Sequence, residues 1–354
     1  MLKLGDGLSE LGYHVDFMVA NAHGSYIDQI PAGVHFMDLK AGQPRSCVPA
    51  LARYMRSERP SAMISALHNA NAATVVARKL SGAEIPVILS IQNNFSSERA
   101  LASTRRKRLE IFAAHHLYRF ADVLAGVSQG VCDDLGRAIP VRKEQLKVIY
   151  NPVVSEDLVA RSNEPTDHPW LAPGQPPVIL GVGRLHPQKD FPMLLNAFAL
   201  VRKRTNARLI ILGQGDDRPA LEAQVQQMGI GDDVSLPGFA ENPYAYMRNS
   251  AVFALSSRHE GLPTVLIEAL ASGCPVVSTD CPDGPHEILQ GGKFGSLTPV
   301  GDPDTFAAAL ISVLEKPKTT PPAESWTPYS QQKCADTYAR LIESFANQAA
   351  VSGK

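Results

Sequence analysis

Residues 256–288 read SSRHEGLPTVLIEALASGCPVVSTDCPDGPHEI, and this stretch combines the signals of a helix, a strand and a polar turn. The apolar run PTVLIEALAS within it has helical length. It begins at Pro263 and is followed by Gly273 and Pro275. Proline suits a helix start and glycine a helix end, so a helix is predicted over residues 263–272. The run PVVSTD that follows has the length and composition of a buried strand. A helix leading directly into a strand favours an α/β sheet.

Two glutamates in this stretch need a chemical explanation. Glu260 lies in a polar turn, whereas Glu268 interrupts the apolar run VLIEALA. An unpaired carboxylate among apolar side chains is costly, so we expect Glu268 to have a partner, and sugar hydroxyl groups are suitable donors. The alternative interpretation is an amphipathic helix whose single acid faces solvent. Unpaired backbone N–H groups near Gly261, Leu262 and Thr264 would favour a phosphate or another electron-rich group.

The rest of the chain alternates between strand-like and helix-like segments. With 354 residues, 44% of them hydrophobic and 19% charged, it is long enough for two globular domains. Strands are predicted at 13–20, 34–39, 62–67, 86–91, 122–127, 146–150, 177–183, 207–213, 233–238, 251–257, 275–280 and 296–300. Helices are predicted at 48–58, 70–80, 98–119, 129–138, 191–204, 217–228, 242–248, 263–272 and 303–315. This alternation indicates two doubly wound α/β domains with parallel sheets.

The predicted domain boundaries follow the proline content. Residues 1–151 form the first domain, 152–176 a proline-rich linker and 177–325 the second domain. Residues 326–354 are predicted to form a C-terminal helix that packs back toward the first domain.

Composition excludes several classes of protein. Neither a disordered chain nor a membrane-spanning helix fits, and the opening residues lack the apolar core of a signal peptide, so we expect a cytoplasmic protein. The five cysteines are scattered and lack metal-ligand spacing, which argues against a zinc site and a disulfide framework.

Charge is distributed unevenly along the chain. Residues 1–151 carry 18 Lys and Arg against 13 Asp and Glu, and a basic cluster consists of Arg99, Arg105, Arg106, Lys107 and Arg108. The cluster would suit contact with anionic lipid headgroups at the inner face of the membrane or with a diphosphate-bearing substrate, and a solvated helix face is the alternative. Nucleic-acid binding is not supported, because no recognition motif or interleaved aromatic residue accompanies it.

Ligands of doubly wound sheets bind at the carboxyl ends of the strands. The first such junction of the second domain, GVGRLHPQKDF (181–191), combines Gly183 with Arg184 and Lys189. His186 stands where a dinucleotide-binding GxGxxG motif would have glycine, whereas an exposed backbone beside two cations suits a diphosphate. The next junction, GQGDDRP (213–219), offers small residues where a ligand could approach the backbone.

Together, GVGRLHPQKDF, LGQGDDRPALE, VSLPGF and the opening stretch resemble family 4 of the retaining glycosyltransferases, which have the two-domain GT-B fold with a cleft between Rossmann-like domains. In the first domain the resemblance is looser and rests on LHNANAATVVARKL, VSQGVCDDL and VIYNPV. It covers essentially the whole chain and implies a transferase that uses a nucleotide sugar and no metal or other cofactor.

The resemblance assigns roles to individual residues. Arg184 and Lys189 would hold the diphosphate and stabilise the leaving nucleotide, Glu268 would bind the ribose, and Glu260 would act on the transferred sugar. Candidate catalytic residues are Glu260, Arg184, Lys189 and His68, and candidate nucleotide-sugar contacts are Gly183, Arg184, Lys189, Gly213, Gly215, Pro237, Gly238, Glu260, Gly261, Leu262, Thr264 and Glu268. Residues 236–239 would lie against the base. Asn69, Asn93 and Ser128 accompany His68, for which a structural role is equally open.

The implied function is transfer of a hexose or N-acetylhexosamine from a UDP-linked donor to a polysaccharide or polyprenyl-diphosphate-linked oligosaccharide, with retention of anomeric configuration. The chain starts inside what is normally the first helix of the family, after its first strand and glycine-rich loop. We therefore expect an upstream extension to raise stability and activity. The alternatives are a truncated nucleotide-sugar-binding protein with little turnover and, less in keeping with the motifs, a nucleotide-sugar epimerase.

Overall fold

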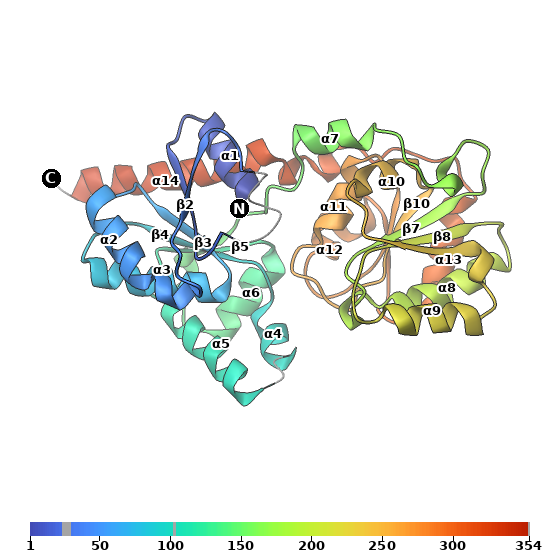
Figure 1. Ribbon diagram of the computed structural model, residues 1–354, viewed down its shortest axis with the longest axis horizontal. Coiled ribbons are helices and arrows are strands. Elements are labelled where there is room, and N and C mark those ends of the chain that lie inside the picture. The colour runs from blue at the N-terminus through green and yellow to red at the C-terminus, as the bar shows by residue number, and fades with distance from the viewer. Residues whose placement is uncertain (23–29, 102–103, 353–354) are drawn as a thin grey trace. The chain divides into compact units, whose positions relative to one another are not determined.

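The computed structural model describes residues 1–22, 30–101 and 104–352 and divides into two α/β units (Figure 1). The first unit consists of Met1–Pro152 together with Gln331–Lys354, and the second of Val153–Ser330. All strand pairs described in both units are parallel, as the alternating sequence predicts.

The described residues of the first unit form two parallel sheets. The smaller consists of β1 (Val15–Val19) and β2 (Val34–Asp38), and the larger has the order β3 (Met63–Ala66), β4 (Val87–Ile91), β5 (Val123–Gly126) and β6 (Leu146–Val148). All residues of β4 and β5 are buried, which explains why these strands are apolar on both faces.

The helices of the first unit are α1 (Leu2–Glu10), α2 (Val48–Glu58), α3 (His68–Ser81), α4 (Phe95–Leu101), α5 (Arg105–Tyr118), α6 (Gln129–Ala138) and α14 (Gln331–Ser352), with short 3-10 turns at Pro44–Cys47 and Lys143–Gln145. The single helix predicted over 98–119 is wrong: α4 and α5 are separate helices on either side of residues 102–103, which lie outside the described residues. Helix α4 begins at Phe95, whose side chain is buried.

The two ends of the first unit's sequence pack together. Helices α1 and α14 lie side by side (Figure 1), and Gln331 donates a hydrogen bond to Asp6 at 2.8 Å. Leu4 of α1 and Tyr338 of α14 share a core with Ile88 of β4. The C-terminal helix is thus an integral part of the first unit.

The second unit is built on one six-stranded sheet. Its order is β12 (Ser296–Thr298), β11 (Val276–Thr279), β10 (Val252–Leu255), β7 (Val178–Val182), β8 (Arg208–Leu212) and β9 (Val234–Gly238). The chain begins in the middle at β7, adds β8 and β9 on one side, and then returns to add β10 to β12 on the other. The carboxyl ends of β7 and β10 therefore flank the point where the order reverses, where ligands bind in sheets of this topology.

Helices cover both faces of this sheet. They are α7 (Glu156–Ser162), α8 (Phe191–Arg202), α9 (Arg218–Gln227), α10 (Pro243–Asn249), α11 (Thr264–Ala271), α12 (Pro285–Ile288) and α13 (Pro303–Leu314), with 3-10 turns at Pro169–Leu171, Pro187–Lys189, Gly231–Asp233, Gln290–Gly292, Ala323–Ser325 and Thr327–Tyr329. Helices α8, α9 and α13 lie on one face, and α10 and α11 on the other (Figure 1). Phe198, Phe306 and Ile179 are fully buried between the first set and the sheet.

Residues 153–176, predicted as part of a linker, instead fold onto the second unit. Ser155 caps α7, and Leu158 of this helix is fully buried where α7 packs against α10. Farther on, Arg208 lies over the Trp170 ring at 4.9 Å. The proline content masked these apolar anchors in the sequence.

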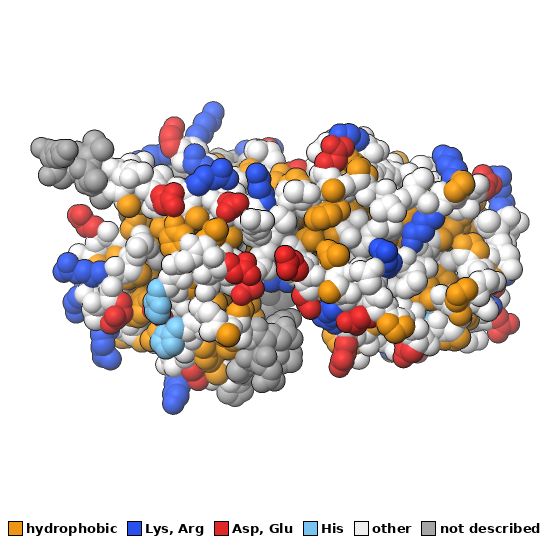
Figure 2. Space-filling view, turned by 90° about the horizontal axis from the view of Figure 1, so that it is seen from above, with side chains coloured by type: hydrophobic (Ala, Val, Ile, Leu, Met, Phe, Trp, Pro, Cys, Tyr) orange, Lys and Arg blue, Asp and Glu red, His pale blue; other side chains and the backbone are white. Residues whose placement is uncertain are grey.

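The surface and the cysteines agree with a globular protein. Figure 2 shows acidic and basic side chains interspersed on the face it presents. All five cysteines are buried, and no disulfide joins any two of them in the part of the chain that the structure describes. Within the described ranges, we find no helix with the length and apolarity needed to cross a bilayer.

Two glycines of the second unit allow neighbouring loops to touch. A Cβ atom on Gly213 would lie 1.9 Å from the carbonyl oxygen of Gly183, and one on Gly215 would lie 2.1 Å from that of Leu185. Backbone hydrogen bonds fix the same contact, since Leu185 N donates to the Gln214 oxygen at 2.9 Å. These glycines are thus required by loop packing, whether or not a ligand also approaches them.

We predict that Gly213→Ala destabilises the chain by about 3 kcal/mol, because the added Cβ meets backbone that cannot move aside and φ is +141°. The measurement is the thermal unfolding midpoint. Gly231→Ala is the control, since its Cβ would meet only a side-chain atom at 3.8 Å, and its midpoint should stay close to that of the parent. Equal midpoints for both variants would contradict the packing explanation.

Candidate functional site

The loops that follow β7 and β10 meet through an ion pair. Lys189 Nζ lies 2.5 Å from Glu260 Oε1, and the two side chains are only 16% and 9% exposed. Ser257 Oγ donates to the same carboxylate oxygen at 2.7 Å, and Gln188 Nε2 lies 3.4 Å from the other. Two residues that the sequence placed in one site are therefore in direct contact, although they are 71 positions apart.

Small residues and backbone bonds position Lys189. A Cβ on Gly183 would lie 3.0 Å from Lys189 Cε, so the lysine stem passes directly over this glycine. Ser256 Oγ donates to the Lys189 carbonyl at 2.6 Å, which joins the loop after β10 to the loop after β7. Next to it, buried Asp190 takes a left-handed conformation (φ +47°) and accepts a hydrogen bond from Arg258 at 2.8 Å. The stem and the backbone of Lys189 are thus held from several sides, and Glu260 holds its ammonium group.

The pair leaves hydrogen-bonding capacity on the Lys189 ammonium group. A largely buried ion pair loses much of its Coulomb energy to desolvation, so its net contribution to folding is small. An ammonium group carries three protons, and one bond to Glu260 leaves donor capacity for a second anion. The arrangement therefore presents an oriented positive charge at the point where the strand order of the second sheet reverses, which we call its switch point.

Arg184 provides a second cation on the same loop. It is exposed and makes no ion pair with any described residue. Its planar guanidinium group is therefore available to two oxygens of an incoming phosphate or carboxylate.

Helix α11 follows the loop after β10 that contains Glu260. Helix α11 begins at Thr264, and Pro263 is its N-cap residue rather than its first helical residue as predicted. Proline cannot cap a helix through its side chain, and no side-chain cap bond is present. Gly284 approaches so closely that its Cβ would lie 2.4 Å from Pro263 Cδ, which fixes the turn containing Gly261 and Leu262.

Glu268 is half-buried on α11 and does have interaction partners, as its apolar surroundings require. Burial raises the pKa of Tyr244, on the neighbouring helix α10, to about 12, and the negative charge of Glu268 adds to the effect. The Tyr244 ring in turn lies under Arg161, at 5.5 Å. The sequence had suggested no role for Tyr244, because a tyrosine in an amphipathic helix is ordinary.

The remaining second-unit candidates lie at the ends of β8 and β9. Gly213 N donates to the Gly238 carbonyl at 2.8 Å, so the loops containing these glycines adjoin. Pro237 is exposed, and Phe239 is 72% exposed, an unusual position for a phenyl ring. Arg218 holds this strand end through the Leu236 carbonyl at 2.7 Å.

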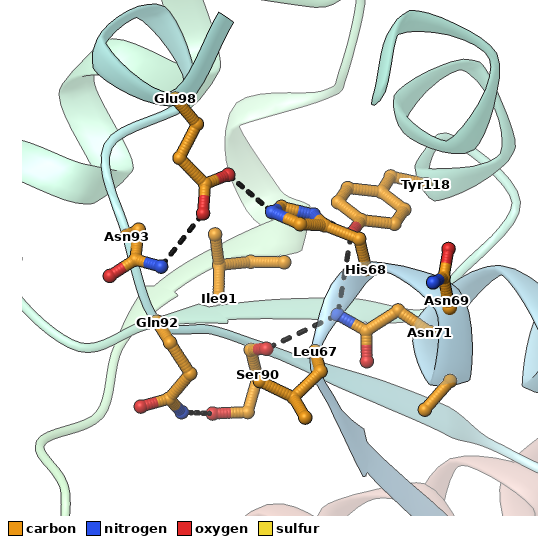
Figure 3. A pocket seen from close by; sticks show the side chains of 11 residues that line it. Leu67, His68, Asn69, Asn71, Ser90, Ile91, Gln92, Asn93, Glu98 and Tyr118 are labelled. Carbon is orange, nitrogen blue, oxygen red and sulfur yellow. Dashed lines mark hydrogen bonds and ion pairs between the residues drawn. The ribbon is translucent and has the colours of Figure 1, made fainter. Parts of the chain in front are cut away.

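His68 lines a polar pocket in the first unit (Figure 3). Its Nδ1 lies 3.0 Å from the Tyr118 hydroxyl, and its Nε2 makes a short contact with Glu98. Asn93 donates to the other oxygen of Glu98 at 2.7 Å, and Asn69 also lines the pocket. The hydroxyl, carboxylate and amide groups gathered here suit a polyhydroxylated ligand.

Glu98 is the main residue that the sequence did not reveal. Burial alone would raise the pKa of Glu98, but the hydrogen bond and charge of His68 and the hydrogen bond of Asn93 outweigh it and hold the pKa below its ordinary value. In the sequence Glu98 precedes Arg99 at the edge of the basic cluster and is indistinguishable from a surface acid.

Buried His115 supports the pocket from behind. Its ring packs against His68, Phe95 and Tyr118, with centroid distances of 5.0, 4.0 and 4.5 Å. Burial lowers the pKa of His115 to about 4, so the ring is neutral at pH 7. It therefore provides a packed, uncharged wall for His68.

The structure also places Ser128 and part of the basic cluster of the first unit. Ser128 is fully buried and caps α6 by accepting from Val131 N at 3.2 Å, which gives it a structural role. In the basic cluster, Arg99, Arg105 and Arg108 are exposed, and Arg99 lies over the Phe112 ring at 5.9 Å. The side chains of Arg106 and Lys107 lie outside the described part of the structure.

Comparison with known proteins identifies two matching family models. "Glycosyltransferase Family 4" matches residues 1–157, and "Glycosyl transferases group 1" matches residues 163–333. The N-acetylgalactosamine-N,N'-diacetylbacillosaminyl-diphospho-undecaprenol 4-alpha-N-acetylgalactosaminyltransferase of Campylobacter jejuni is 31% identical over 233 residues, 66% of this chain and 59% of the relative. The lipopolysaccharide 1,6-galactosyltransferase of Escherichia coli is 26% identical over 299 residues, 82% of this chain and 75% of the relative. Against three of the curated relatives, the match spans only 48% to 59% of the relative's length.

Solved structures share the fold at low sequence identity. The lipopolysaccharide outer core galactosyltransferase WaaB in its apo form has a TM-score of 0.70 at 20% identity, with 96% of this chain and 93% of that chain covered. HepE of Anabaena in complex with UDP and glucose has a TM-score of 0.73 at 19% identity, with coverages of 99% and 96%.

We predict that His115→Phe removes a pH dependence of stability. The pKa of His115 is about 4 in the folded chain and about 6.5 in the unfolded chain. At pH values between about 4 and 6.5 the unfolded chain therefore binds more protons, and stability falls as pH is lowered. The parent should lose about 2 kcal/mol through this residue between pH 7 and pH 5, and the variant should not. Urea unfolding at both pH values tests this. His116→Phe, a change at the adjacent and more exposed histidine, should retain the loss; identical pH profiles for parent and His115→Phe would contradict the explanation.

Proposed function

We propose a reaction for this chain, which belongs to the glycosyltransferases of family 4 and group 1 and has the GT-B fold. It transfers a hexose or N-acetylhexosamine from a nucleotide sugar to a polysaccharide or lipid-linked oligosaccharide. The observation that carries the proposal is the Lys189–Glu260 pair at the switch point of the second sheet, beside exposed Arg184. A pair of oriented cations at this position suits a diphosphate.

We propose that the donor binds the second unit as a UDP-sugar. Lys189 donates through its remaining protons, and Arg184 donates through its planar guanidinium group. Both neutralise the charge that grows on the diphosphate as the bond between sugar and diphosphate breaks. Cations of the protein would then serve where other transferases use a metal ion. Glu268 accepts hydrogen bonds from the ribose hydroxyl groups, and the segment 236–239 lies against the base.

Glu260 has a double role in this proposal. One oxygen orients the Lys189 ammonium group, and the carboxylate also accepts hydrogen bonds from the transferred sugar, aided by the backbone at Gly261 and Leu262. The departing phosphate takes the proton of the incoming hydroxyl group on the same face of the sugar, which retains the anomeric configuration. The protein then contributes orientation and charge stabilisation rather than a covalent intermediate.

We propose that the acceptor binds the first-unit pocket around His68. Hydrogen bonds with Glu98, which accepts, and with the Tyr118 hydroxyl fix the His68 ring, and Asn69 and Asn93 offer amide groups to sugar hydroxyls. The exposed arginines of α4 and α5 suit the diphosphate or the anionic headgroups of a membrane-borne acceptor at the cytoplasmic face. The C. jejuni relative, whose name includes a diphospho-undecaprenol substrate, supports an acceptor of this kind.

Ligand screening tests the proposal at its first step. Thermal shifts of the full chain are measured with UDP, GDP and ADP, alone and as their sugars, followed by product analysis with labelled donors and glycan acceptors. A UDP-sugar should stabilise the chain and yield an elongated acceptor. Stabilisation without product would favour a nucleotide-sugar-binding protein, and conversion of the donor without an acceptor would favour an epimerase.

Variants separate binding from transfer. Lys189→Ala and Glu268→Ala should each weaken UDP binding by about tenfold or more, because each removes a charged hydrogen-bond partner. Glu260→Ala should reduce transfer more than UDP affinity. Isothermal titration with UDP and turnover with the identified donor provide the measurements.

The control is an exposed lysine–glutamate pair of the same unit. Lys293 Nζ lies 3.0 Å from Glu324, with side chains 56% and 60% exposed, so Lys293→Ala should leave UDP affinity unchanged. Unchanged UDP affinity in Lys189→Ala and Glu268→Ala would refute the assignment of the donor site.

A further inference from the structure

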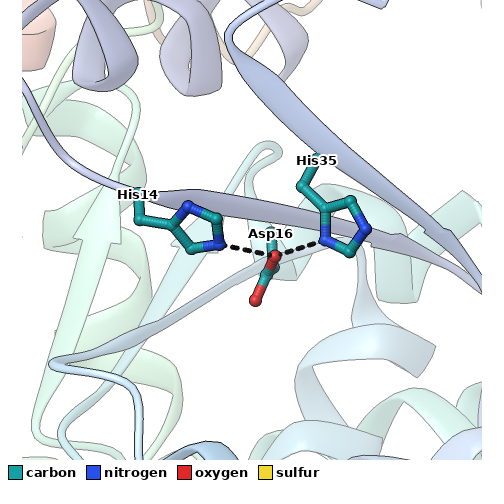
Figure 4. Close-up of side chains that lie close together, drawn as sticks. All are labelled: His14, Asp16 and His35. Atoms are coloured by element: carbon teal, nitrogen blue, oxygen red, sulfur yellow. Dashed lines mark hydrogen bonds and ion pairs between the residues drawn. The ribbon is translucent and has the colours of Figure 1, made fainter.

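Two histidines and an aspartate converge on the small sheet of the first unit (Figure 4). His35 Nδ1 lies 2.7 Å, and His14 Nε2 lies 3.3 Å, from the same oxygen of Asp16, Oδ1. The histidine side chains are 60% and 82% exposed, whereas Asp16 is only 14% exposed. Two accessible imidazoles thus share one positioned carboxylate oxygen.

Strand geometry explains the convergence. Asp16 of β1 is the register partner of His35 of β2, so these side chains are neighbours on one face of the sheet. His14 directly precedes β1, two positions before Asp16, and its contact with Asp16 Oδ1 places it on the same side. The two imidazole rings stack with centroids 6.3 Å apart. A shift of β2 by one residue would place His35 on the opposite face.

The second carboxylate oxygen of Asp16 accepts a hydrogen bond from helix α2. The Tyr54 hydroxyl on α2 donates to Asp16 Oδ2 at 2.5 Å. This bond fixes the carboxylate plane and leaves Oδ1 directed at the two histidines. An outer hydrogen bond of this kind is a regular feature of metal-binding carboxylates.

We propose that His14, Asp16 and His35 bind a divalent transition metal ion, with Zn²⁺ as the best match to the donor set. Imidazole nitrogens are borderline donors and a carboxylate oxygen is a hard one, and Zn²⁺ and its neighbours in the first transition series bind this mixed set. The three ligand atoms lie within 4.8 Å of one another. Zn–N and Zn–O bonds of about 2.0–2.2 Å at tetrahedral angles put ligand atoms roughly 3.4 Å apart, so the exposed histidine rings would have to move when the ion binds.

The proposed site is separate in its residues from the donor and acceptor sites described above. Solvent fills the coordination positions that the protein leaves open, as in metal sites with three protein ligands. The ion would link β1 to β2, which among the described strands pair with each other and with no third strand. Its expected effect is therefore stabilisation of this part of the first unit.

Zn²⁺ titration of the tag-free full chain, freed of metal by a chelator, tests the proposal. Calorimetry should detect one strong site per chain, and Zn²⁺ should raise the thermal midpoint. His14→Ala and His35→Ala should abolish this binding, and Tyr54→Phe should weaken it by about tenfold through loss of the outer hydrogen bond. Co²⁺ added as a spectroscopic probe should give visible absorption in the parent and not in the histidine variants.

His286→Ala provides the matched control, because His286 is also exposed and lies 3.2 Å from a single carboxylate, Asp280. Its Zn²⁺ affinity should equal that of the parent. Absence of Zn²⁺ binding by the parent, equal binding by His14→Ala or His35→Ala, or loss of binding in His286→Ala would each overturn the proposal. Circular dichroism of every variant establishes that it is folded before its affinity is compared.

Discussion

The contact between Lys189 and Glu260 depends on the order of strands in the second sheet. Only the reversal at β7 makes β10 its neighbour, and only parallel pairing brings the loops after both strands to the same edge. Desolvation removes most of the stability that such a partly buried pair could give. What the contact does provide is an ammonium group with a fixed direction, which a charge-neutralising site requires and a solvated lysine cannot supply.

Close backbone packing is the second condition for this arrangement. Gly183 gives the lysine stem its path, and the loop after β8 lies directly against the same segment because Gly213 has no side chain. Glycine at strand ends is usually attributed to a bound ligand. Here the protein itself fills the space beside Gly213 and Gly215, so their presence in the sequence is explained without a nucleotide and does not by itself locate one.

The sequence predicted every strand to within a few residues, because buried parallel strands are short apolar runs bounded by turn residues. It also predicted that Lys189 and Glu260 belong to one site. It did not predict their ion pair, because a side-chain contact across 71 positions depends on tertiary geometry. Helix α7 was missed because the prolines around it outweighed one buried leucine. Glu98 was missed because nothing local distinguishes an acid that holds a histidine from one that faces water.

The cluster of His14, Asp16 and His35 illustrates the same limit in another form. Searching for metal ligands by spacing examines residues close in sequence, and only the pair at positions 14 and 16 satisfies such a pattern. The third member comes from the next strand, and its place is fixed by the register in which β2 pairs with β1. Clusters assembled by register are therefore invisible to motif searches, and the polar residues on paired strands are where a structure adds most to the sequence.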